Sequence, residues 1–98
     1  MAYSFAQLED LRVRVNQQLA AQQTQLENAK RQFSAIKENL TGMQTQYAEW
    51  VTDIEALLTA NPSDRAVQAL AASKDRLVAE FASTKAESIA LEIKVKAG

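Results

Sequence analysis

The stretch TANPSDR, residues 59–65, is the one strong break in a chain that otherwise has the residue pattern of helix. Pro62 fixes its own φ angle and keeps the residue before it out of the helical region. Ser63 or Asp64 can cap a following helix, and Asp64 also places negative charge at the N-terminus of that helix. The sequence therefore predicts a turn at 59–63 with a helix on each side.

Before this break, apolar residues recur with unbroken heptad spacing, which is typical of a coiled coil. Only Arg12 and Gln22 interrupt the pattern. A single helix over 5–58 would be about 81 Å long, whereas a compact chain of this length has a radius of gyration near ~13 Å. We therefore expect the N-terminal part to project as a coiled-coil arm. The a positions and then the d positions are Phe5, Arg12, Leu19, Leu26, Phe33, Leu40, Tyr47 and Ile54, followed by Leu8, Val15, Gln22, Ala29, Ile36, Met43, Trp50 and Leu57.

Gly42 is the one position inside this stretch where the helix could break, because glycine costs roughly 1 kcal/mol against alanine in a helix. The heptad register nevertheless passes from Leu40 to Met43 without an inserted residue. We therefore favour a continuous helix. The alternative is a three-helix bundle broken near Gly42, with helices at about 5–40, 43–59 and 64–96.

After the break, residues 64–96 form an alanine-rich segment without glycine or proline, which predicts one long helix. Folded back at Pro62, the two helices would pair residues whose numbers add up to about 124, so that Phe33 meets Leu91 and Ile54 meets Leu70. The predicted fold is all-α, a single domain over 1–98 built as a long antiparallel helical hairpin.

Two apolar surfaces have no partner in such a hairpin: the N-terminal arm and one flank of the second helix. Unpartnered apolar faces favour contact with another molecule, and a second copy is the simplest one. We therefore expect a homo-oligomer. The predicted interface residues are Phe5, Leu8, Val15, Leu19, Gln22, Leu26, Val78, Ile89 and Ile93.

Composition argues against an active site. The chain has no histidine and no cysteine, which removes the commonest general base, thiol nucleophiles and the usual zinc ligands. Glu49 and Asp53 share a helical face and are interpreted as solvated surface carboxylates. Gly42 stands alone, so no phosphate-binding loop forms around it. We predict no catalytic, cofactor-binding or metal-binding residues.

The net charge and the hydropathy of the chain limit the kinds of partner and location that we expect. The net charge is −1 and the basic residues are scattered, which does not favour nucleic acid. No stretch is apolar enough for a membrane span or a signal peptide. A soluble protein of the cytoplasm or of a virion is expected, with leaderless export left open. The uncharged, glutamine-rich stretch 15–26 is either a neutral surface or a seam in which Gln22 sets the register.

The segment Asn61-Pro62-Ser63-Asp64, between an amphipathic and an alanine-rich helix, resembles the hairpin turn of type III secretion needle subunits. That resemblance implies a small helical hairpin that polymerises. Arg65 stands where the family usually has a second proline, and the N-terminal helix is longer and more regular than in that family. A short glutamine-rich coiled coil would also suit a bacteriophage virion or scaffold component, although no motif supports this.

These features predict a non-enzymatic, self-associating structural or adaptor protein, such as a subunit of a larger assembly. The alternative is a small helical binding module that inhibits or sequesters a protein or a small ligand. Concave, partly polar cavities would favour that alternative.

Overall fold

The computed structural model describes residues 3–28 and 33–97, and over these ranges the chain is helical with no strand. The predicted all-α class is confirmed. The helices are α1 (Phe5–Asn28), α2 (Phe33–Gln46), α3 (Ala48–Ala60) and α4 (Arg65–Ala97).

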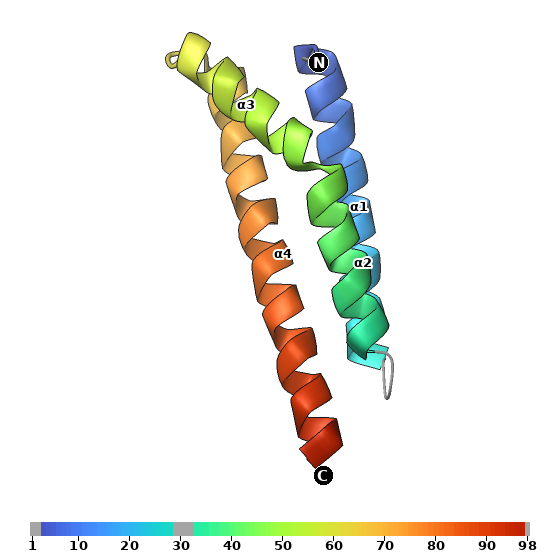
Figure 1. The fold of residues 1–98 in the computed structure, drawn as a ribbon. Coiled ribbons are helices and arrows are strands. Elements are labelled where there is room, and N and C mark those ends of the chain that lie inside the picture. Colours follow the sequence, from blue (N-terminus) through green and yellow to red (C-terminus); the bar gives the residue numbers. More distant parts are fainter. Residues whose placement is uncertain (1–2, 29–32, 98) are drawn as a thin grey trace.

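The helices form a bundle of three rods, in which α2 and α3 together make one bent rod (Figure 1). The chain descends through α1, returns through α2 and α3, and descends again through α4. Each of the four helices contacts the other three, and the molecule measures 52 × 19 × 18 Å. Rods that follow one another along the chain are therefore antiparallel, whereas α1 and α4, which also contact each other, run in the same direction.

The predicted single helix over 5–58 is wrong, because α1 ends at Asn28 and α2 begins at Phe33. Residues 29–32, and with them the predicted d position Ala29, lie outside the described residues. The chain reverses direction between Leu26 and Phe33, which are one heptad apart. A reversal of that length leaves the phase of the apolar pattern unchanged, so the pattern resembles that of an unbroken helix.

The alternative prediction of three packed rods is correct in the number of rods and wrong in the position of the break. Gly42 lies inside α2, where an added Cβ atom would meet nothing within 4 Å. The interruption between α2 and α3 falls at Tyr47 (φ −100°, ψ 10°). The backbone N–H of Tyr47 donates to the carbonyl of Met43 (2.9 Å), and the N–H of Val51 donates to the carbonyl of Tyr47 (3.1 Å). Because these helical hydrogen bonds are kept, the rod bends at Tyr47 without separating into two.

The turn around Pro62 separates α3 from α4, close to the bounds predicted for it. The carboxylate of Asp64 accepts hydrogen bonds from the backbone N–H groups of Ala66 (2.9 Å) and Val67 (3.3 Å). N–H groups in the first turn of a helix have no acceptor within the helix, so the Asp64 carboxylate supplies the acceptor and caps the N-terminus of α4.

One apolar core runs along the axis of the bundle and receives side chains from all four helices. The heptad positions fill it: apart from the half-buried Phe5, Arg12, Gln22 and Leu57, every described a and d position is buried. From α4 the core receives Leu70, Ala71, Leu77 and Phe81.

Polar contacts attach α1 to the bent rod, so the predicted projecting arm is also wrong. The indole Nε1 of the buried Trp50 donates to the backbone carbonyl of Leu8 (2.9 Å). The Tyr47 hydroxyl donates to Oε1 of Gln18 (2.6 Å). An arm of this amphipathic character buries its apolar side against its own chain once the reversal allows it.

Candidate functional site

The predicted interface residues separate into a buried group on α1 and an exposed group on α4. Leu8, Val15 and Leu19 are each 1% exposed, and Leu26 is 6% exposed. They form the core of this chain and could not meet another molecule without opening the bundle.

Phe5 and Gln22 are half-buried. Phe5 packs against the edge of the core. The side chain of Gln22 accepts a hydrogen bond from Nδ2 of Asn39 on α2 (3.4 Å). Gln22 therefore lies at a contact between two helices of the same chain, whereas the sequence interpretation placed it between molecules.

The α4 group is exposed as predicted for an unpartnered face. Val78 is 42% exposed, Ile89 38% and Ile93 62%. Among the described residues, six large apolar side chains are exposed, and four of them belong to α4. Exposed apolar side chains gathered on one helix are typical of a surface that contacts another molecule.

The orientation of α4 follows from its sequence. Leu70, Leu77 and Phe81 point into the core, and Ser88, which is fully buried, donates its hydroxyl to the carbonyl of Lys85 (2.7 Å). With these side chains inward, the opposite side of α4 faces away from the bundle. We call one row of exposed positions on α4 the outer seam: Ala79, Ala82, Ala86, Ile89, Ile93 and Lys96.

Charged groups lie at both ends of the outer seam. Near its N-terminal end, Asp75 is exposed and pairs with Lys74 (2.6 Å), which also reaches Glu55 on α3 (3.4 Å). At its C-terminal end, Lys96 is exposed and pairs with Glu92 (3.0 Å). The seam therefore carries an acid at one end and a base at the other.

Two pKa shifts accompany these pairs. Burial alone lowers the pKa of Lys74, but the hydrogen bonds and negative charge of Asp75 and Glu55 outweigh burial and raise the pKa above its ordinary value. The hydrogen bond from Lys96 is the main cause that lowers the pKa of Glu92, which also accepts a hydrogen bond from the Ser34 hydroxyl. Both shifts favour the charged forms of Lys74 and Glu92.

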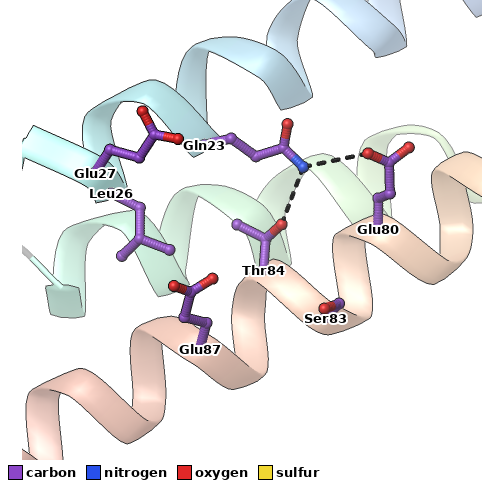
Figure 2. A pocket seen from close by; sticks show the side chains of 7 residues that line it. All are labelled: Gln23, Leu26, Glu27, Glu80, Ser83, Thr84 and Glu87. Carbon is purple, nitrogen blue, oxygen red and sulfur yellow. Dashed lines mark hydrogen bonds between the residues drawn. The ribbon is translucent and has the colours of Figure 1, made fainter.

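A second concave feature lies between α1 and α4. Figure 2 shows Gln23 extending from α1 toward α4, where its Nε2 donates to Thr84 Oγ1 (3.3 Å) and Glu80 Oε1 (3.4 Å). The cavity has a volume of about 340 Å³. We call it the α1–α4 pocket, and it is lined by Gln23, Leu26, Glu27, Glu80, Ser83, Thr84 and Glu87.

The chemistry of the α1–α4 pocket is acidic. Glu27 and Glu87 lie at one end, and Glu80 lies at the other, where Arg76 pairs with it (2.6 Å) (Figure 2). Three carboxylates against one guanidinium give the lining a net negative charge at neutral pH, which suits a cationic group.

The sequence interpretation missed the α1–α4 pocket because it treated the segment that forms α1 as a projecting arm and did not place it beside this part of α4. Glu80, Thr84 and Glu87 recur at helical spacing on one side of α4, and Gln23 and Glu27 do so on α1. That spacing was a usable signal, but only once α1 is known to pack against α4.

Metal ligands and membrane-spanning helices are two further features to consider in residues 3–28 and 33–97. No group of three or more carboxylates there could hold a metal ion. Asp53, one of the two acids sharing a face of α3, accepts a hydrogen bond from the backbone N–H of Tyr3 (3.0 Å). Within the same ranges, no helix combines the length and apolar character needed to cross a bilayer.

Over the described residues, the geometry defines the class of protein as a three-rod up-down-up helical bundle in which α4 has an exposed apolar face. Searches of protein-family models, of curated proteins and of solved structures found no match to this chain.

Proposed function

We propose that this protein is a non-enzymatic, self-associating structural or adaptor protein, and that the outer seam of α4 is its contact surface. The supporting observation is the exposure of Ile89 and Ile93 along the outer seam, with Val78 beside it. Apolar side chains in a row on one helix lose contact with water when a second helix covers them, which is the main source of association energy between helices.

The three alanines of the outer seam add to this argument. Ala79, Ala82 and Ala86 are exposed and carry no bulk beyond Cβ. Interaxial distance between packed helices depends on the side chains at the contact, so this stretch allows a second helix to approach closely. The isoleucines then have room to enter the space beside the alanines.

The proposed assembly is small and closed. The outer seam is one patch. When such a patch binds its own copy about a two-fold axis, both copies of the patch are buried in the dimer and none is left for a third molecule. A needle-like polymer or a virion shell would need a second contact, and the buried side chains of α1 do not provide one. Within this proposal, the protein acts in the cytoplasm or in a virion as a paired helical element.

The proposal is tested by absolute mass from light scattering after size exclusion, over a range of concentrations. We expect a mass of twice 10.8 kDa at the highest concentration. The double variant Ile89→Lys/Ile93→Lys should run as a monomer, because two charges on the seam would lose hydration in the contact.

Val13→Lys is the matched control, since Val13 is 44% exposed but lies on α1. It should leave the mass unchanged. A wild-type monomer at every concentration, or an equal loss of association in the Val13 variant, would contradict a contact through α4.

The α1–α4 pocket supports a second candidate, a binding module that sequesters a small cationic ligand. We expect a polyamine such as spermidine to raise the melting temperature more than sodium at equal ionic strength. Glu27→Gln/Glu87→Gln should remove the difference, while Glu9→Gln/Glu38→Gln, at exposed acids elsewhere, should not. Equal shifts with both salts would refute the candidate.

A further inference from the structure

We propose that the second copy docks on the outer seam with its α4 antiparallel to the first, in a register where facing residue numbers add up to about 175. This inference rests on the proposed self-association and specifies how the two copies meet.

The spacing of the outer seam identifies it as a coiled-coil surface. Positions 79, 82, 86, 89, 93 and 96 follow one another at alternating intervals of three and four residues. All six are exposed in the isolated chain. Alternating three- and four-residue steps place side chains in a straight row that a partner helix can cover.

Size complementarity selects the register. In an antiparallel pair, a positions face d positions of the partner helix, so Ala82 lies opposite the partner's Ile93 and Ala86 opposite the partner's Ile89. The two-fold axis repeats both layers. Each layer then combines a small and a large side chain, which allows close packing.

A parallel arrangement gives the opposite result. Ile89 and Ile93 would face their own copies, and Ala82 and Ala86 would face theirs. The pair of helices would then be held apart at one end and leave unfilled space at the other, which costs contact along the alanines.

The charges at the two ends of the outer seam also favour the antiparallel direction. In the antiparallel register, the partner's Lys96 lies over Ala79, and its ammonium extends toward Asp75, one turn closer to the N-terminus of α4. Both side chains are exposed, at 73% for Asp75 and 76% for Lys96. A parallel pair would instead place Asp75 beside Asp75 and Lys96 beside Lys96.

The shape of the chain permits this contact. The stretch 79–96 is about 27 Å long. The C-terminal turns of α4 extend beyond the lower ends of α1 and α2 in Figure 1. In the C-terminal part of the seam, Ile93 is 62% exposed and the Lys96 side chain 76% exposed.

A charge exchange tests the register. Asp75→Lys alone should weaken self-association because it places two lysines together at each end, and Lys96→Glu alone should do so because it places two carboxylates together. An equimolar mixture of the two variants should associate as the wild type does, since both ends of a mixed dimer are again complementary. Light scattering on the mixture would overturn the inference if the mixture associated no better than either variant alone.

Spin-label distances provide a second test that does not depend on those variants. The chain has no cysteine, so Ala72→Cys and Ser83→Cys each carry a single label. The antiparallel register predicts label separations of about 46 Å at position 72 and below about 20 Å at position 83. Short separations at both positions would show a parallel dimer and overturn this inference while leaving self-association intact. The absence of any intermolecular distance, with a monomeric mass, would overturn both.

Discussion

Trp50 connects α3 to α1. Its side chain is 2% exposed, and its indole N–H reaches the carbonyl of Leu8 on α1. Tyr47, one helical turn earlier, makes the comparable bond to Gln18 with its hydroxyl, closer to solvent. These two donors keep α1 in register with the bent rod of α2 and α3.

We predict that Trp50→Phe lowers the free energy of unfolding by about 2–3 kcal/mol, because it removes a buried donor and part of a ring. Tyr47→Phe is the matched control and should cost about 1 kcal/mol or less, since Gln18 is half-buried and water can replace the hydroxyl. Urea unfolding followed by far-UV circular dichroism measures both. Equal costs would show that the Leu8 carbonyl does not depend on the indole.

Lys74 gives the chain a pH dependence in the alkaline range. Because its folded-state pKa is raised, the contribution of its charged form is complete below the unfolded pKa of about 10.4 and is lost as pH rises through the higher folded value. We predict that the wild type loses stability over this window more steeply than Lys74→Met. Urea titrations from about pH 9 to about pH 12 test this; parallel curves for the two proteins would contradict it.

At the scale of elements, α2 contains a glycine at a position where the backbone does not require one. Gly42 has no positive φ angle and no neighbour that a methyl group would meet. The bend of the rod lies instead at Tyr47, a residue with a large side chain in the core. A weak helix former therefore does not by itself locate the end of a helix.

We predict that Gly42→Ala raises the free energy of unfolding by about 1 kcal/mol, because alanine loses less backbone entropy in the helix and nothing obstructs its side chain. Thermal unfolding gives the readout. A lower melting temperature in this variant would indicate that α2 does break at Gly42.

At the scale of the whole molecule, α1 is an integral rod of the bundle. It contributes Leu8, Val15, Leu19 and Leu26 to the core and covers one side of both α2 and α4. With α1 removed, the remaining helices would expose the residues that it covers.

We predict that deleting residues 1–28 abolishes cooperative unfolding and produces binding of an apolar dye, because the remaining hairpin would lose one rod of its core. Calorimetry and dye fluorescence on the truncated chain provide the test. A sharp transition in the truncated chain would show that 33–97 folds independently and that α1 is dispensable.

Much of this architecture was predictable from local pattern. The heptad assignment identified the buried positions of α1, α2 and α3, and Pro62 with Asp64 located the boundary between α3 and α4. The exposed flank of α4 was predicted because Val78, Ile89 and Ile93 lie on the wheel away from Leu70 and Leu77. The α1–α4 pocket was not predictable in this way, since its two walls are separated by more than fifty residues of sequence (Gln23 to Glu80, |i−j| = 57).

The sequence by itself determined that the protein is helical, where its last helix begins, and which side chains avoid water. The tertiary structure alone decided whether α1 buries those side chains against its own chain or against another molecule. The physical reason is that the reversal between Leu26 and Phe33 takes up one heptad and leaves the apolar phase intact. An extended arm and a folded-back rod therefore have the same pattern of residues, and only the packing of α1 against α2 and α4 distinguishes them.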